Sequence, residues 1–283
     1  MTARTWARWR ALRSSFALRK AAAKELVDIS QPGDKIAVIA FDTDAYRLAA
    51  LTEIKPGTEQ QLAKAELRRA IDFVGQAGST DLNAGLNAGF SELLSDTSNQ
   101  RRAAVFLTDG EQTSGTYNNN SHLQYRNSGW PVYTVGFGQA DFALLSKIAA
   151  ETQGECLNKC QSFTDLSQLQ VFYHDVLQRQ IANGNILLSQ SSLLAQGESQ
   201  QLAAPLPPGQ DSATFLAVWP GSQVDLSLIS PSGRVIDANT LGDDVYHSKQ
   251  PTYETFTVQN PEVGAWRVNV YGAALAAGGE RVD

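Results

Sequence analysis

Residues 103–110 read Ala103-Ala104-Val105-Phe106-Leu107-Thr108-Asp109-Gly110, five apolar residues followed by a short polar turn. A continuous apolar run of this length, without alternation, is typical of a strand that is covered on both faces. Asp109 and Gly110 end the run with residues that favour a turn. The pattern therefore predicts a buried strand that carries the Asp109 carboxylate at its end.

Similar runs lie on both sides of this stretch. Residues 36–41 are apolar, with an edge partner expected over residues 46–51, and residues 131–135 form the next run. Segments with apolar residues at helical spacing lie around these runs, and they predict helices that begin near Ala11, Thr58, Asp81, Asp141 and Thr164. Alternating strands and helices indicate an α/β fold, a doubly wound and mostly parallel sheet with helices on both faces.

Two of the helix starts carry specific signals. Thr58 and Gln61 have the spacing of a capping box, and the helix that follows them would place Leu62 on its inward face. The segment Gly78-Ser79-Thr80-Asp81 precedes the next helix and predicts an N-cap there.

The periodicity changes beyond Gly184. Residues 224–228 alternate between apolar and polar, and Trp266 shares one face of the stretch 265–271 with two valines. Because no helical pattern intervenes, we expect an antiparallel β-sandwich. The predicted organisation is an α/β domain over residues 1–184, a boundary strand and linker over 185–210, and the sandwich over 211–283.

Composition and charge narrow the classes of function. Hydrophobic residues make up 42% of the 283 residues and charged residues 18%, which is ordinary for a globular protein. The net charge of -6 argues against nucleic acid, whose phosphates need a basic surface. Residues 1–24 are basic but lack the apolar core of a signal peptide, and no apolar run is long enough to span a bilayer. We expect neither nucleic-acid nor membrane contact.

The two cysteines, Cys156 and Cys160, are separated by three residues. A structural zinc site would lack ligands, because the chain has no second cysteine pair and only three histidines. Two interpretations stay open, a pair of free buried thiols and a small loop closed by a disulfide in an exported protein.

Two oxygen-bearing side chains are expected at the same edge of the sheet. Ligands of an open α/β sheet bind beyond the carboxyl ends of its strands, where Asp109 ends a strand and Thr80 precedes a helix. A carboxylate and a hydroxyl are hard ligands that suit Mg²⁺, Mn²⁺ or Ca²⁺. Gly78, Ser79 and Gly110 would shape the two loops. A helix cap at Thr80 and a turn residue at Asp109 explain the same spacing, so the residues alone leave both interpretations open.

Three segments in this order resemble the von Willebrand factor type A domain. They are residues 32–41, residues 78–86 and residues 105–110, with Val135-Gly136-Phe137-Gly138 after them. The resemblance covers about residues 12–184. It implies a metal-ion-dependent adhesion site, in which a divalent cation takes its last ligand from a carboxylate of a protein or glycan partner. Thr80 and Asp109 match the second and third segments of that site.

The first segment of the family pattern, a central strand ending in Asp-x-Ser-x-Ser, does not precede the helix expected from about Ala11 to Asp28. The cation would keep only Thr80 and Asp109, so we expect metal binding to be weak or absent. The sheet would also lack its central first strand, leaving strands 36–41 and 103–107 with unpaired edges. We therefore expect a chain truncated at its N-terminus, with Met1 a misplaced or truncated start.

The resemblance implies a non-enzymatic binding or adhesion protein that is secreted, periplasmic or displayed at the cell surface. The sandwich resembles β domains that accompany this module in secreted bacterial proteins. The sequence contains no P-loop, Gly-x-Ser-x-Gly or His-Glu-x-x-His motif, and His122 lies in a polar stretch where we expect an exposed side chain. Two alternatives stay open, a non-catalytic accessory part of a larger secreted hydrolase and an inert structural module.

Overall fold

The computed structural model describes residues 15–75, 79–98, 101–161, 186–240 and 242–283. The first part of the chain is built from, in order, α2 (Ser15–Ile29), β1 (Lys35–Phe41), β2 (Ala45–Glu53), α3 (Thr58–Asp72), α4 (Leu82–Leu94), β3 (Ala104–Thr108), α5 (Asn120–Ser128), β4 (Val132–Gly136), α6 (Phe142–Glu151) and the short helix η1 (Leu157–Cys160). Gly78, the helix predicted from Thr164 and its end at Gly184 lie outside the described residues. The alternation of strands and helices confirms the predicted α/β class.

The strands of this part form two pairs. β1 and β2 are antiparallel, from Lys35 opposite Glu53 to Phe41 opposite Ala45. β3 and β4 are parallel, from Ala104 opposite Val132 to Thr108 opposite Gly136. Across the described ranges, β1 pairs only with β2 and β3 only with β4, and the missing central strand stays a prediction.

Helical periodicity predicted the buried face correctly in α4 but not in α3. α4 buries Leu82 and Leu86 at 1% exposure, as its apolar stripe predicts. In α3 the predicted capping box is wrong, because Gly57 is the N-cap and Thr58 is already helical. Leu62 is 65% exposed, since the buried face of α3 is partly polar and follows Gln60, Lys64, Leu67 and Ile71.

The second part is all-β. Its strands are β5 (Ser192–Leu194), β6 (Ser199–Leu206), β7 (Ser212–Val218), β8 (Gln223–Ile229), β9 (Val235–Ile236), β10 (Val245–Lys249), β11 (Tyr253–Gln259), β12 (Gly264–Ala274) and β13 (Glu280–Val282). A sheet in the order β6-β12-β8-β9 packs on one in the order β10-β11-β7 over a core that includes Trp219, Phe256 and Trp266. β6 lies in the stretch predicted as boundary strand and linker, and the domain bounds stay a prediction.

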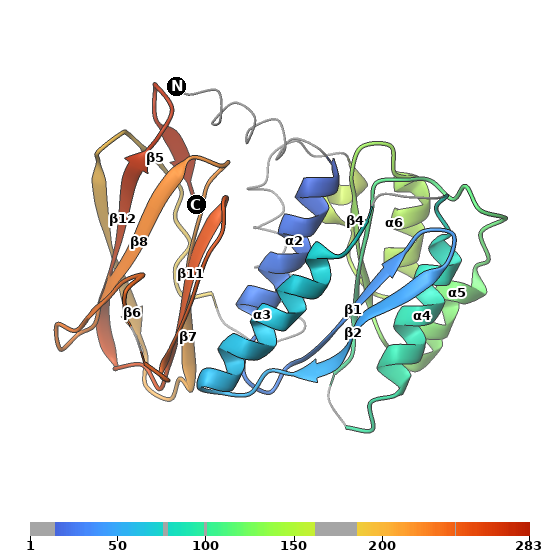
Figure 1. Cartoon of the computed structure of the whole chain (residues 1–283), viewed down its shortest axis with the longest axis horizontal. Helices are drawn as coiled ribbons and strands as arrows, with labels where there is room; N and C mark the ends of the chain where they lie inside the picture. Colours follow the sequence, from blue (N-terminus) through green and yellow to red (C-terminus); the bar gives the residue numbers. More distant parts are fainter. Residues whose placement is uncertain (1–14, 76–78, 99–100, 162–185, 241) are drawn as a thin grey trace.

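The two parts meet through a polar cluster at α2 and α3, which lie between the sandwich and β1–β2 in Figure 1. The carboxylate of Asp28, on α2, is fully buried and accepts hydrogen bonds from Ser248 at 2.8 Å, Tyr253 at 2.6 Å and Tyr246. Arg68, on α3, forms an ion pair with the same carboxylate. Strands β10 and β11 of the sandwich are thereby joined to the helices. None of the helices over the described residues has the length and apolar character needed to cross a bilayer.

Candidate ligand-binding site

The carboxyl end of β3 holds the first element of the candidate site. The Thr108 carbonyl accepts a hydrogen bond from the N–H of Phe137, 2.9 Å away, which ties the end of β3 to the end of β4. The Thr108 hydroxyl accepts from the N–H of Gly110 at 3.2 Å. These bonds hold the turn that carries the Asp109 carboxylate at the edge of the parallel pair.

The loop of Thr80 lies against this turn. The Thr80 N–H donates to the Thr113 hydroxyl at 2.7 Å, and the Thr80 carbonyl accepts from the N–H groups of Thr113 at 2.9 Å and Ser114 at 3.1 Å. A β-carbon added at Gly110 would lie 2.7 Å from Thr80 Oγ1, so a larger residue would force the Thr80 side chain to move. Thr80 and the Asp109–Gly110 turn are therefore neighbours. Their role as metal ligands stays a prediction, as does the role of Ser79, which is exposed beside Thr80.

Asp81 joins the two loops to the end of β1. Its carboxylate caps α4 by accepting from the N–H of Asn83 at 2.9 Å, and it also accepts from the Gln112 amide at 3.0 Å. Partial burial raises the pKa of Asp81, but the hydrogen bonds from Gln112 and from the backbone of Ala84 and Asn83 outweigh burial and leave that pKa below its usual value. The Asp81 N–H donates to the Asp42 carbonyl at 2.6 Å. Three loops thus converge at one edge of the strands.

Arg19 on α2 reaches the same edge, which sequence patterns did not predict. Its guanidinium lies 3.1 Å from the Asp109 carboxylate, and both side chains are about one quarter exposed, at 22% and 25%. Burial lowers the pKa of Arg19, while the attraction of Asp109 opposes that shift. The excess of basic residues within residues 1–24 was visible in the sequence, but Asp109, the partner of Arg19, lies ninety positions further along the chain.

The donor set at this edge can be compared with what a divalent cation requires. Thr80 and Asp109 supply a hydroxyl and a carboxylate, which are suitable donors, but Mg²⁺ or Ca²⁺ takes about six oxygen ligands. Over the described ranges, no group of three or more His, Cys, Asp or Glu side chains lies close enough to hold a metal ion. The Asp109 charge is already balanced by Arg19. These residues alone therefore do not fit a divalent cation.

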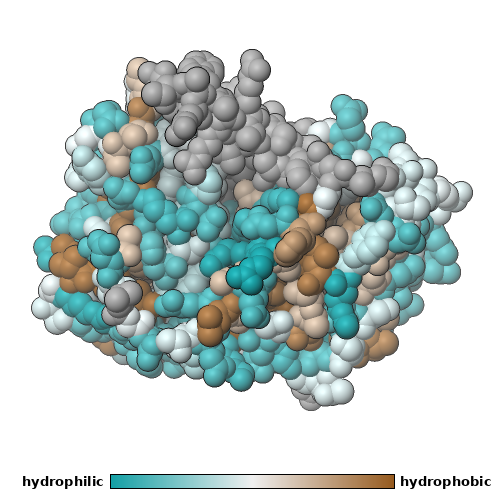
Figure 2. All heavy atoms as spheres, in the orientation of Figure 1, coloured by the Kyte–Doolittle hydropathy of each residue, from teal (hydrophilic) through white to brown (hydrophobic). Residues whose placement is uncertain are grey.

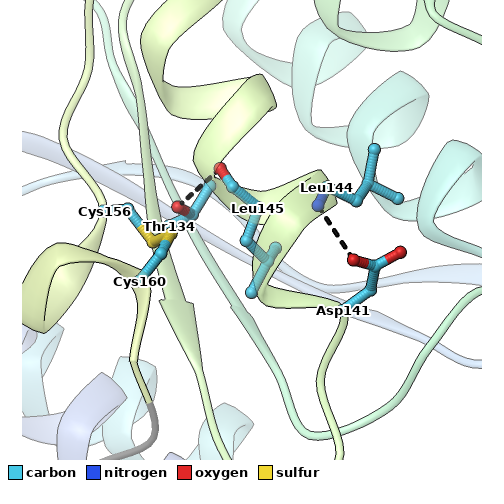
Figure 3. Close-up of a disulfide and its surroundings, with 6 residues drawn as sticks. All are labelled: Thr134, Asp141, Leu144, Leu145, Cys156 and Cys160. Atoms are coloured by element: carbon cyan, nitrogen blue, oxygen red, sulfur yellow. Dashed lines mark hydrogen bonds between the residues drawn. A yellow bond between two sulfur atoms is a disulfide. The ribbon is translucent and has the colours of Figure 1, made fainter.

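A disulfide lies beside β4, as Figure 3 shows. It joins Cys156 and Cys160, whose Cα atoms are 5.2 Å apart. Cys156 forms an isolated parallel bridge with Thr134 of β4, and the Thr134 hydroxyl donates to the Leu145 carbonyl of α6 at 3.1 Å. The disulfide thus closes the segment that follows α6 against the sheet.

The expectation of an exposed His122 is wrong. The residue lies on α5 with 0% exposure, because its ring is hydrogen-bonded on both sides. Nδ1 lies 2.7 Å from the Tyr117 hydroxyl and Nε2 lies 2.8 Å from the Glu151 carboxylate. Burial and the nearby Glu151 charge raise the Tyr117 pKa, so this phenol is poorly suited to be a nucleophile. The chain of three groups connects the loop before α5 to α6.

The family model of the von Willebrand factor type A domain matches residues 10–171, more than half of the 283 residues. The chain belongs to the von Willebrand factor type A domain family. This agrees with the α/β architecture and with the resemblance carried by the three sequence segments.

Similar proteins include the inter-alpha-trypsin inhibitor heavy chain H1 of Homo sapiens, 28% identical over 190 residues that cover 62% of this chain and 20% of that protein. The calcium-activated chloride channel regulator 1 of Equus caballus is 25% identical over 240 residues, covering 76% of this chain and 24% of that protein. The chain thus spans about a quarter or less of the length of these curated relatives.

Two solved structures are also similar. A von Willebrand factor type A protein from Catenulispora acidiphila has a TM-score of 0.48 and 16% identity, covering 94% of this chain and 59% of that chain. Proximal thread matrix protein 1 from the mussel byssus, solved with a zinc-occupied MIDAS motif, has a TM-score of 0.47 and 17% identity, covering 58% of this chain and 42% of that chain.

Proposed function

We propose that this chain is a non-enzymatic binding module that captures an acidic group of a protein or glycan ligand at the edge formed by Thr80, Asp109 and Arg19. The observation that carries the proposal is the approach of the Thr80 hydroxyl to the Asp109–Gly110 turn at the carboxyl end of β3. Open α/β sheets bind their ligands at this edge. Membership of the von Willebrand factor type A family supports the same location.

The proposal includes a divalent cation only if further oxygen ligands complete its coordination. The mussel protein similar to this chain is described with a zinc-occupied MIDAS motif. Only together with oxygen ligands that the described residues do not supply would Thr80 and Asp109 hold Mg²⁺, Mn²⁺ or Ca²⁺, which would then attract a ligand carboxylate. Arg19 must then leave Asp109, because the guanidinium and the cation would share one carboxylate. We therefore expect metal affinity to rise when Arg19 is removed.

An inert structural module is the second candidate. The Arg19–Asp109 ion pair favours it, because Arg19 already neutralises Asp109, the one charged candidate metal ligand, within the chain itself. The accessory part of a larger hydrolase is the third candidate. No contact among the described residues supports it. We also propose that the protein acts outside the cytoplasm, because the Cys156–Cys160 disulfide is suited to an oxidising compartment.

Mn²⁺ binding and ligand capture test the proposal together. Calorimetric titration with Mn²⁺ is made on the wild type, Arg19→Ala, Asp109→Asn and the control Glu111→Gln, an exposed carboxylate two residues beyond the candidate ligand. Retention on a surface bearing a glutamate-rich synthetic peptide is measured with Mn²⁺ and with EDTA. We expect the affinity for Mn²⁺ to increase about tenfold or more in Arg19→Ala and to disappear in Asp109→Asn.

The outcomes separate the candidates. Retention that needs Mn²⁺ and Asp109 supports metal-dependent capture. Retention that survives EDTA but is lost in Arg19→Ala means that the guanidinium itself binds the acidic group. A wild type that retains no peptide and an Arg19→Ala variant that binds no Mn²⁺ would leave the inert module as the function.

A further inference from the structure

The sheet β6-β12-β8-β9 of the sandwich turns one face toward the core and the other face outward. On its central strand β12, the side chains of Trp266 and Val270 belong to the core. Because side chains alternate along a strand, Arg267, Asn269 and Tyr271 face outward. Trp266 is 1% exposed, whereas Tyr271 is 42% exposed. The outward face is therefore open to solvent along its central strand.

Polar side chains of three neighbouring strands form a row across this face. Asn269 of β12 lies opposite Gln201 of β6 and Ser227 of β8. The Gln201 amide donates a hydrogen bond to Asn269 Oδ1 at 2.7 Å, and the Asn269 amide donates to Ser227 Oγ at 3.5 Å. We call these three residues the polar row. Its side chains orient one another, and each keeps donors or acceptors that it can offer to a ligand.

An aromatic ring and a cation lie on either side of the polar row. Tyr271 and Arg267 are four residues apart on β12, which separates their Cα atoms by about 13 Å. Among the described residues, the exposed Arg267 guanidinium takes part in no ion pair or hydrogen bond. The other charged residue on the outward face of β6, β12 and β8 is Asp225, opposite Tyr271, and it is paired with Lys249. The face thus carries one positive charge that is not balanced within the described structure.

These groups favour one class of ligand over others. β12 is hydrogen-bonded on both sides, to β6 and to β8, so the middle of the face offers no backbone edge to a peptide strand. A nucleic acid binds through several phosphate contacts, for which one cation is too few. Figure 2 shows mostly hydrophilic residues over the strands of the sandwich, whereas the core of a protein interface is enriched in aromatic and apolar residues. Amides and hydroxyls match the hydroxyls of a saccharide, and an exposed aromatic ring can pack on the apolar side of a sugar ring.

We propose that the outward face of β6, β12 and β8 binds an acidic oligosaccharide. The Tyr271 ring packs on one sugar ring, the polar row hydrogen-bonds the hydroxyls of the saccharide, and the Arg267 guanidinium pairs with a carboxylate of a uronic acid unit. Charge complementarity at Arg267 is the reason that the ligand is acidic. The proposal does not rest on the binding function at Thr80 and Asp109, because it needs no cation and uses a different part of the chain.

Two saccharides and four variants test the proposal on the whole chain. The saccharides are tetragalacturonate and its methyl ester, which has the same rings without the charges. Affinity is measured by calorimetric titration in EDTA, and the residues involved are located by NMR chemical shifts. The variants are Tyr271→Ala and Arg267→Gln. Their matched controls are Phe73→Ala, at an aromatic residue that is 74% exposed after α3, and Arg69→Gln, at an exposed arginine of α3.

We expect tetragalacturonate to bind the wild type and to shift resonances of β6, β12 and β8. Tyr271→Ala should weaken the binding of both saccharides about tenfold or more, because both use the ring. Arg267→Gln should reduce the affinity for tetragalacturonate to that for the ester and leave the ester unchanged, because only the acid pairs with the guanidinium. The two controls should bind as the wild type does. Both substituted side chains are exposed, so the temperature of thermal unfolding should stay unchanged.

Four results would overturn the proposal. The first is a wild type that does not bind tetragalacturonate. The second is equal affinity for the acid and the ester, which would mean that Arg267 does not select the ligand. The third is a glutamate-rich peptide that binds as tightly and shifts the same residues, which would assign the face to an acidic peptide. The fourth is binding that needs Mn²⁺ and is lost in Asp109→Asn but not in Tyr271→Ala, which would place the saccharide at the edge of the α/β part.

Discussion

Gly110 shows how one missing side chain allows the candidate site to form. Its backbone lies so close to Thr80 Oγ1 that an added β-carbon would sit 2.7 Å from that oxygen. Gly154 is a second such position, where an added β-carbon would lie 2.1 Å from the Val132 carbonyl oxygen. Local sequence patterns predicted the elements that precede both glycines. The need for glycine at these two positions, however, comes from residues that are distant in the sequence.

Gly110→Ala should destabilise the fold by about 1–3 kcal/mol, because the Thr80 side chain must move to admit the methyl group. Urea unfolding measures the change. Gly75→Ala is the control, since an added β-carbon there meets nothing within 4 Å. Adding Thr80→Ala to Gly110→Ala should restore part of the loss. A Gly110→Ala variant as stable as the control would mean that the two loops are not packed together in solution.

At the scale of elements, α3 packs against two parts of the molecule, the α/β core and the sandwich. Leu67 and Ile71 pack on the α/β core with Val27 and Ile54. Lys64 turns toward the sandwich, donates to the Asp28 carbonyl at 2.7 Å, and lies over the Tyr246 ring at 4.0 Å. Desolvation lowers the pKa of Lys64 to about 7, against the attraction of Asp28. The polar face of this helix is thus an interface and not a solvated surface.

The Lys64 amine makes the stability depend on pH above neutrality. Its pKa is about 7 in the folded chain and 10.5 in the unfolded chain, so the unfolded state binds more protons between these values. The free energy of unfolding should therefore increase as the pH rises from 7 toward 10. Urea unfolding at pH 7 and pH 9 checks this in the wild type and in Lys64→Met. A wild-type profile as flat as that of Lys64→Met would show that the amine is not buried.

At the scale of the whole molecule, the Asp28 cluster joins the α/β part and the sandwich. The Asp28 carboxylate accepts from three hydroxyls of the sandwich and pairs with Arg68 of α3. Gln31, in the loop after α2, adds a hydrogen bond to the Thr214 hydroxyl at 2.8 Å. Such a network couples the two parts because each of its members is buried or partly buried and would lose its partner on separation.

Asp28→Asn should lower the stability by about 3–5 kcal/mol, since it leaves the Arg68 charge and several hydroxyls without the carboxylate. We expect scanning calorimetry to show one transition for the wild type and two for the variant, as the sandwich unfolds separately. Asp72→Asn is the control, because its carboxylate is 58% exposed in a surface pair with Lys24, worth about 0–1 kcal/mol. Two transitions already in the wild type would contradict the coupling.

Local patterns in the sequence were sufficient for the class of fold. The apolar runs predicted β1, β3 and β4, and Asp81 and Asp141 cap the helices that were expected to begin there. These features depend on neighbours within a few residues, which determine periodicity and capping. The order of the three segments also predicted the family.

Tertiary contacts decided what those patterns could not show. Leu62 is exposed because the sandwich selects a different face of α3, and His122 is buried because Tyr117 and Glu151 enclose it. Arg19 meets Asp109 across ninety positions, and Asp28 meets Tyr253 across more than two hundred. Pairings of this kind depend on how separate elements pack, and packing leaves no local period in the sequence. For that reason the edge that carries Asp109 could be predicted, but the charge that faces it could not.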